Sequence, residues 1–152
     1  MRYMLRVAYD GTEYCGWQIQ PGLRTVEGTL KSALNKLMGT DVPLIGASRT
    51  DAGVHAIGQV ANFHLDEHFS AEEIFEDLNR HLPEDIAVTK IKEVDDRFHS
   101  RYQAVEKTYR YRIRTSPVPN VFERKFLYQY GQTLDVDKMK KLSTIRNQKM
   151  PK

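Results

Sequence analysis

From Ser48 to Gly58 the chain reads SRTDAGVHAIG, which places one carboxylate in a glycine-bounded turn. Apolar segments of strand-like character flank this turn at residues 42–47 and 59–65. In the second segment Ala61, Phe63 and Leu65 alternate with more polar neighbours, as expected for a strand with one buried face. The sequence therefore predicts two strands joined through a turn that carries Asp51.

Asp51 is the candidate catalytic residue of this turn. Arg49 supplies a cation two positions earlier, and Ala52 leaves open space beside the carboxylate. That combination suits an ionised nucleophile. An aspartate followed by small residues is also common in ordinary turns, where the side chain caps its own backbone. The spacing alone leaves both interpretations open.

Upstream of the turn, the pattern predicts a strand and a helix. Residues 2–9 alternate in strand fashion, and Asp10-Gly11 then supplies a turn. Thr25 is placed to cap a helix, and Gly39 is placed to end it. Between them the apolar side chains recur at helical spacing: Val26, Leu30, Ala33, Leu34, Leu37 and Met38.

Downstream, a second helix and a fourth strand are predicted. Ser70 and Glu73 have the spacing of a capping box, and Pro83 ends the apolar stripe Ile74, Phe75, Leu78 and Leu82. Residues 86–94 follow as a strand. The order strand, helix, strand, strand, helix, strand predicts an α+β protein of the ferredoxin-like, split βαβ class. In this class two helices cover one face of an antiparallel sheet and leave the other face open.

The last third of the chain is predicted to hold further elements. A fifth strand is expected over residues 107–114, with Tyr109, Tyr111 and Ile113 on one face and arginines on the other. Residues 126–130 are a candidate sixth strand. A helix is expected to begin at Asp135, but the polar residues 143–152 do not complete its apolar face.

Composition is that of a soluble, single-domain globular protein, with 152 residues, 40% of them hydrophobic and 28% charged. Because no apolar run is long enough to span a bilayer and the N-terminus shows no signal segment, a cytoplasmic location is expected. Cys15 is the only cysteine, which excludes an internal disulfide. The histidines lack the spacing of a metal site, so no metal is expected.

The net charge of +3 says little about partners, but the basic residues are unevenly distributed. Between Arg97 and Arg114 the only acidic residue is Glu106, and tyrosines are interleaved among the cations. This combination suits phosphate neutralisation beside aromatic platforms for bases, although a solvated basic strand has the same pattern. The candidate RNA-binding residues of this segment are Arg101, Lys107, Arg110 and Arg112.

Several motifs, in order along the chain, resemble the A family of tRNA pseudouridine synthases. The Asp51 turn, Arg49 to His55, is the most specific of them, and any other taken alone would be weak. The resemblance covers roughly residues 1–141. The other matching motifs are Tyr9-Asp10-Gly11, Tyr14 with Gly16-Trp17-Gln18, Gly58-Gln59-Val60, Asn79 with Leu82-Pro83, Phe98-His99-Ser100-Arg101 and Lys107-Thr108-Tyr109-Arg110-Tyr111.

The resemblance implies an enzyme that isomerises uridine to pseudouridine in the anticodon stem-loop of tRNA, as a homodimer without cofactor or metal. Asp51 aligns with the family's catalytic aspartate, and Tyr109 aligns with the tyrosine that contacts the flipped uridine. Arg49 would pair with Asp51 or insert where the base leaves the stack, and Tyr111 is expected to pack.

Trp17 and His55, which also belong to these motifs, each have two possible roles. Trp17 could line the RNA cleft or anchor the core. His55 could touch RNA backbone or form an ordinary hydrogen bond.

The family continues beyond this length, so we expect a truncated form with an incomplete second half. The expected domains are residues 1–134, carrying Asp51, and residues 135–152, the start of the second half or a divergent tail. Unpaired strand edges would then favour self-association or marginal stability. Two other functions stay open: a non-catalytic RNA-binding module, and a ferredoxin-like interaction domain with no RNA role.

Overall fold

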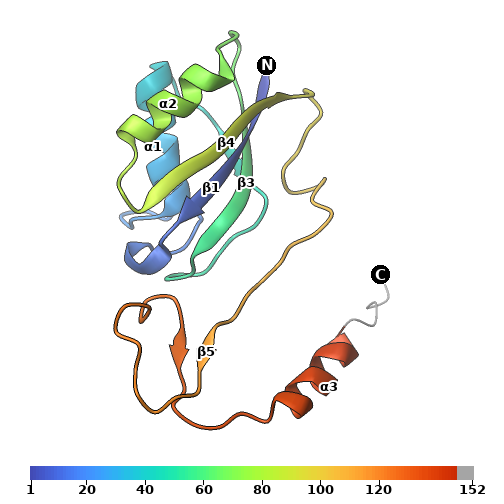
Figure 1. Cartoon of the computed structure of the whole chain (residues 1–152). Coiled ribbons are helices and arrows are strands. Elements are labelled where there is room, and N and C mark those ends of the chain that lie inside the picture. Colours follow the sequence, from blue (N-terminus) through green and yellow to red (C-terminus); the bar gives the residue numbers. More distant parts are fainter. Residues whose placement is uncertain (147–152) are drawn as a thin grey trace. The chain divides into compact units, whose positions relative to one another are not determined.

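The computed structural model describes residues 1–146 and divides into two compact units between Lys107 and Thr108 (Figure 1). The first unit holds a four-stranded sheet and two helices, and the second holds a two-stranded sheet and one helix. The α+β class predicted from the sequence is confirmed. Among the described residues, none of the helices has the length and apolar character needed to cross a membrane.

The sheet of the first unit is antiparallel and has the strand order β2-β3-β1-β4. Its strands are β1 (Arg2–Tyr9), β2 (Leu44–Gly46), β3 (Ala56–His64) and β4 (Ile86–Val94). All four strands predicted from the sequence are confirmed, although β2 is shorter than expected and β3 begins earlier. The first strand therefore lies inside the sheet, between β3 and β4.

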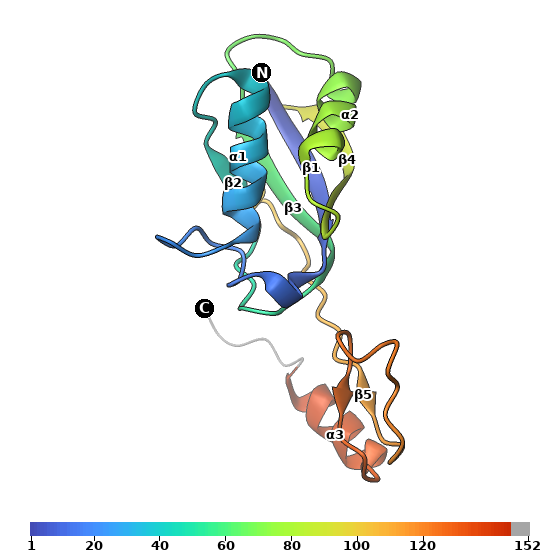
Figure 2. The ribbon, with the colours of Figure 1, turned by 90° about the vertical axis from the view of Figure 1, so that its left-hand side faces the viewer.

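Two helices, α1 (Val26–Met38) and α2 (Ala71–His81), cover the same face of this sheet (Figure 2). The Thr25 side chain accepts a hydrogen bond from the Gly28 N–H and so caps α1, as predicted. Gly39 ends α1 in the left-handed region, with φ of 68°, where glycine has no steric penalty. A short 3-10 helix, η1 (Gly11–Glu13), follows β1.

The capping box predicted at Ser70 is wrong. Within residues 1–146 the Ser70 side chain makes no capping hydrogen bond, and the first turn of α2 is closed by the backbone bond from Ile74 N–H to Ser70 C=O. Ser70 is exposed, so water can satisfy its hydroxyl. The helix ends at His81, since Leu82 must be extended ahead of Pro83.

The core of the first unit lies between the sheet and the two helices. Tyr3 and Phe63 face each other across β1 and β3 with ring centroids 5.3 Å apart. Trp17, which is 1% exposed, belongs to this core, so of its two interpretations the core anchor is confirmed. The fully buried aliphatic side chains of the core are Leu5, Val7, Val26, Leu30, Leu34, Val42, Ile74 and Leu78.

On the opposite face of the sheet, residues 95–107 contact β2, β3 and the first residue of β1. Ser100 is buried there, because its N–H donates to Asn62 Oδ1 at 2.9 Å and its hydroxyl donates to the Ile45 carbonyl at 2.8 Å. Arg6 and Lys90, which are register partners on β1 and β4, remain exposed on this face. The face without helices is therefore partly open and basic.

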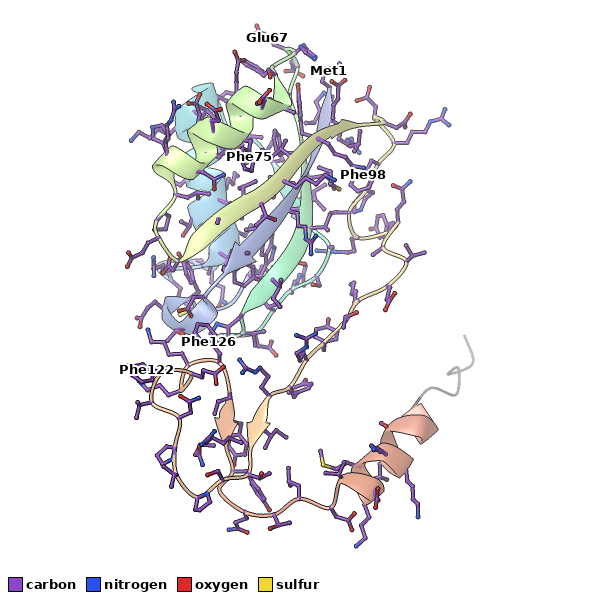
Figure 3. All side chains as sticks on the ribbon, in the orientation of Figure 1. Met1, Glu67, Phe75, Phe98, Phe122 and Phe126 are labelled. Atoms are coloured by element: carbon purple, nitrogen blue, oxygen red, sulfur yellow. The ribbon has the colours of Figure 1, made fainter. Side chains whose placement is uncertain are left out.

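The second unit contains the parallel pair β5 (Ile113–Arg114) and β6 (Tyr128–Gln129), followed by α3 (Val136–Arg146). The predicted fifth strand is wrong over residues 107–112, because β6 offers partners only to Ile113 and Arg114. Tyr111 is 88% exposed, so the expectation that it packs is also wrong. Phe122 and Phe126 are exposed in the same unit (Figure 3).

Candidate active site

Asp51 lies at the tip of a turn between β2 and β3, with its side chain open to solvent. The neighbouring residues Ala52, Gly53 and Val54 are exposed as well. The Val54 N–H donates to the Asp51 carbonyl at 3.2 Å, and Gly53 has a φ of 76°, which favours glycine. The turn thus presents a carboxylate to any molecule that approaches this end of the sheet.

The main chain of residues 14–17 supports the turn from beneath. Trp17 N–H donates to the Thr50 carbonyl at 3.0 Å, and Gly53 N–H donates to the Tyr14 carbonyl at 3.2 Å. Between them, Gly16 comes so close that a Cβ would lie 2.7 Å from the Thr50 oxygen. The two bonds therefore hold the turn on both sides of Asp51.

A second group of contacts comes from the end of β1. The Tyr9 and Thr50 hydroxyls are 2.8 Å apart and share a hydrogen bond. Burial raises the pKa of Tyr9, and the bond to Thr50 opposes this increase. Gly11 passes so close to the turn that a Cβ there would lie 2.0 Å from the Val54 carbonyl oxygen. The backbone of residues 9–11 therefore packs directly on the turn, and only glycine fits at position 11.

His55 is a hydrogen-bonded residue of this site. Its Nδ1 accepts from the Gly11 N–H at 3.0 Å and lies 3.2 Å from Asp10 Oδ1. When Nδ1 accepts from Gly11, the proton of a neutral ring lies on Nε2. Of the two interpretations of His55, the structure shows the hydrogen bond.

Arg49 shares the turn with Asp51 and is exposed. None of the ion pairs in residues 1–146 joins the two side chains. The guanidinium and the carboxylate are therefore both presented to solvent from neighbouring positions of one turn.

The candidate RNA-binding residues fall into both units. In the first unit Arg101 donates to the Gly46 carbonyl at 3.4 Å, and Lys107 donates to the Ala47 carbonyl at 3.0 Å. The structure thus brings these two cations to the strand that leads into the Asp51 turn. In the second unit Tyr109 is 63% exposed, Arg110 is exposed, and Arg112 pairs with Glu123.

Sequence reasoning missed Arg6 as a candidate. It lies on the open face of β1, over Gly58 of β3, where a Cβ would lie 2.3 Å from Arg6 Nε. The signal was present, because Arg6 alternates with the buried residues Leu5 and Val7 along β1. A cation therefore lies on the open face beside the strand that follows the turn.

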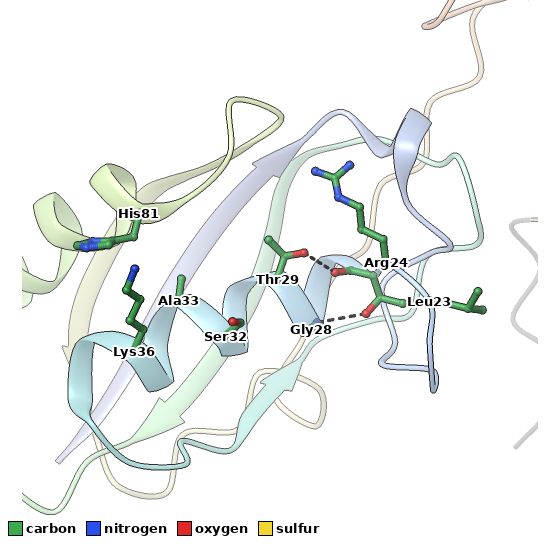
Figure 4. Close-up of a pocket in the computed structure, with 9 residues that line it drawn as sticks. Leu23, Arg24, Gly28, Thr29, Ser32, Ala33, Lys36 and His81 are labelled. Carbon is green, nitrogen blue, oxygen red and sulfur yellow. Dashed lines mark hydrogen bonds between the residues drawn. The ribbon is translucent and has the colours of Figure 1, made fainter.

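A separate groove runs between α1 and α2, where Lys36 and His81 approach each other (Figure 4). It is also lined by Arg24, Thr29 and Ser32, and it contains none of the candidate site residues. In the part of the chain that the structure describes, no group of three or more His, Cys, Asp or Glu side chains is arranged to hold a metal.

Comparison with known proteins gives consistent results. The sequence profile of a family described as tRNA pseudouridine synthase matches residues 6–103. The chain is 45% identical over 144 residues to tRNA pseudouridine synthase A of Bacillus sp. strain KSM-64, which covers 94% of this chain and 59% of that protein. The same-named protein of Limosilactobacillus reuteri strain DSM 20016 is 47% identical over 143 residues, or 92% and 56% of the two chains. The chain therefore spans somewhat more than half the length of these curated relatives.

Proposed function

This chain belongs to the tRNA pseudouridine synthase family, and from that premise we propose that it carries the catalytic carboxylate for converting uridine to pseudouridine in tRNA. The observation that carries the proposal is the exposed Asp51 on a turn whose backbone is held by the segment beneath it. A carboxylate fixed in direction but open to solvent is available to a substrate that docks over the turn.

The reaction itself explains the need for a carboxylate. The bond between N1 of the base and C1′ of the ribose breaks, and a bond between C5 and C1′ forms. N1 gains a proton and C5 loses one, so no oxidant or reductant takes part. The Asp51 carboxylate can add to the sugar, add to the base, or relay the proton from C5.

RNA recognition follows from charge and from the need to expose C1′. A uridine stacked in a helix must be flipped out, at a cost of a few kcal/mol. Arg6, Arg101 and Lys107 lie on or beside the open sheet face and supply phosphate contacts. Arg49 would enter the space left by the base. In the second unit, Tyr109 would stack on the flipped uridine while Arg110 and Arg112 bind phosphate.

The finer features of the family belong to the same proposal. The strand order β2-β3-β1-β4 with both helices on one face supports a ferredoxin-like, split βαβ arrangement. Residues 1–134 and 135–152 remain the proposed domain limits. The anticodon stem-loop as substrate, homodimer formation, a cytoplasmic location and independence from cofactors are likewise predictions for this chain.

An isomerisation assay on the full chain tests the function. The substrate is a tRNA transcript with tritium at C5 of uridine, and release of tritium measures turnover. We expect Asp51→Asn to lower the rate by more than about a thousandfold while leaving tRNA affinity unchanged. Asp66→Asn, at an exposed aspartate outside the site, is the matched control and should keep the wild-type rate. Unchanged turnover by Asp51→Asn would reject the proposal.

A second candidate function is favoured by the partial coverage of the relatives, 56–59% of their length. In that case the chain is a non-catalytic RNA-binding module. Filter binding of the same tRNA across a range of salt concentrations separates the outcomes. Salt-dependent binding without tritium release from the wild type supports the module, and no salt-dependent binding supports an interaction domain without an RNA role.

A further inference from the structure

The Asp51 turn has little packing of its own, since Asp51, Ala52, Gly53 and Val54 are all exposed. Its direction therefore depends on the segment beneath it. Tyr14 is central to that segment, because its carbonyl accepts the Gly53 N–H two residues beyond Asp51. Contacts that hold the Tyr14 backbone in place therefore also restrain the turn at Gly53.

The Tyr14 side chain is held by two charged residues from elsewhere in the chain. Its hydroxyl donates to Asp85 Oδ1 at 2.5 Å and accepts from the Arg24 guanidinium at 3.0 Å. Arg24 also pairs with Asp85 at 3.1 Å, and its guanidinium carbon lies 4.1 Å from the centre of the Tyr14 ring. Tyr14 is only 3% exposed, so its ring has no room to move independently of this cluster.

Backbone hydrogen bonds also join Asp85 and Arg24 to the segment that follows β1. Asp10 N–H donates to the Asp85 carbonyl at 3.0 Å, and Cys15 N–H donates to the Arg24 carbonyl at 2.8 Å. The loop after α2, the start of α1 and the segment after β1 therefore meet at Tyr14. None of these three side chains needs to touch the substrate to influence Asp51.

We propose that Tyr14, Arg24 and Asp85 are positioning residues for the catalytic turn, acting on Asp51 through the Tyr14 carbonyl and the Gly53 N–H. This inference rests on the proposed function, in which Asp51 is the reacting carboxylate. The hydroxyl of Tyr14 then sets the orientation of its own backbone carbonyl, and the carbonyl in turn restrains the turn.

Amide hydrogen exchange, followed by NMR on the full chain, tests the inference. Tyr14→Phe keeps the ring and removes the hydroxyl, so we expect the Gly53 and Trp17 amides to exchange about tenfold faster or more. The matched control is Tyr3→Phe, which also removes a buried hydroxyl. The Tyr3 hydroxyl bonds to the backbone of Phe69 and not to the Asp51 turn. This control should leave both amides of the turn unchanged.

A second variant and a core reporter distinguish positioning from general stability. Asp85→Asn keeps an acceptor for Tyr14 but loses the ion pair with Arg24. It should also speed amide exchange at Gly53 and Trp17, by a smaller factor than Tyr14→Phe. The Ala61 amide, in the core strand β3, should exchange as in the wild type. Unchanged exchange at Gly53 in both variants, or an equal increase at Ala61, would overturn the inference.

The effect on catalysis is measured in a separate experiment, by steady-state kinetics of tRNA isomerisation. Tyr14→Phe should lower kcat for tRNA isomerisation about tenfold or more with little change in KM, because the turn is misdirected while RNA contacts remain. If the wild-type chain releases no tritium, the proposed function fails, whereas the exchange measurement still decides whether the cluster restrains the turn. If isomerisation occurs but exchange at Gly53 is unaffected, only the positioning inference fails.

Discussion

The hydroxyl of Tyr14 is the most perturbed acid of the site. Burial raises its pKa well above the ordinary value of 10.0, and the hydrogen bond to Asp85 and the charge of Asp85 act in the same direction. The Arg24 charge opposes them but does not reverse the shift. In the folded protein Tyr14 therefore stays protonated at a pH where the same side chain ionises in the unfolded chain.

This difference predicts how stability responds to alkaline pH. A group whose pKa is higher in the folded state contributes stability below the unfolded value, and that stability is lost as pH rises above about 10. In wild type the free energy of unfolding should therefore fall above about pH 10. Tyr14→Phe should make this fall shallower by up to about 1.4 kcal/mol per pH unit. Urea denaturation at several alkaline pH values measures both slopes, and equal slopes would contradict the prediction.

Individual residues of the site differ in how far the sequence reveals them. Asp51 could be singled out as a candidate because it lies in a short turn, but only the match to a family raised it above an ordinary turn residue. Arg24 and Asp85 could not be predicted, since they lie 61 positions apart and meet only when α1 and the loop after α2 pack together. Local spacing carries no information about such contacts.

At the scale of elements, the two helices begin in different ways. Thr25 is buried, and its hydroxyl oxygen accepts from Gly28 N–H at 3.2 Å at the start of α1. Ser70 occupies the same position before α2 and is exposed, without a capping hydrogen bond in the described residues. Capping therefore stabilises α1 through a side chain and α2 only through its backbone.

This contrast predicts unequal costs for the same kind of change. Thr25→Ala should lower the free energy of unfolding by about 1 kcal/mol or more, because it removes a cap and a buried methyl group. Ser70→Ala should change it by less than about 0.5 kcal/mol. Urea denaturation of both variants at neutral pH makes the comparison, and equal losses would show that Ser70 caps α2 after all.

Elements of the first unit were predictable because each has its own periodicity and its own stop signals. The segment at residues 107–112 has strand periodicity as well, yet it forms no strand, because alternation does not supply a neighbour with free backbone groups. The capping box at Ser70 was also predicted from spacing alone, and spacing does not determine whether the hydroxyl bonds to the backbone or to water. A residue pattern shows which secondary structure a segment can adopt, whereas its tertiary contacts determine which one it adopts.

At the scale of the whole molecule, the two units differ in how completely they are packed. The buried hydrophobic cluster lies entirely within residues 3–88 and is built from both helices and the sheet of the first unit. In the second unit large apolar side chains remain exposed, among them Tyr111, Phe122 and Leu142. Alternation in the sequence predicted the covered face of the first unit. The exposure of apolar side chains in the second unit could not be predicted in the same way, because local periodicity does not specify packing partners.

The completeness of the first core leads to a prediction about folding. Residues 1–107 alone should unfold cooperatively, with a thermal midpoint within about 4 °C of the transition of the full chain, because no core residue is removed. Circular dichroism during heating measures both midpoints. A shift of this size corresponds to less than about 1 kcal/mol for a domain of this length.

A shorter chain that ends at residue 94 provides the control. It lacks Ser100, whose two hydrogen bonds join Asn62 and Ile45, and it lacks Phe98, whose carbonyl accepts from Arg2 at 2.6 Å. Each lost bond contributes about 1 kcal/mol, so this chain should melt well below residues 1–107. If residues 1–107 fail to unfold cooperatively while the full chain does so, the first unit needs the second for its stability. Equal midpoints for the two shortened chains would instead show that residues 95–107 add nothing to the stability of the fold.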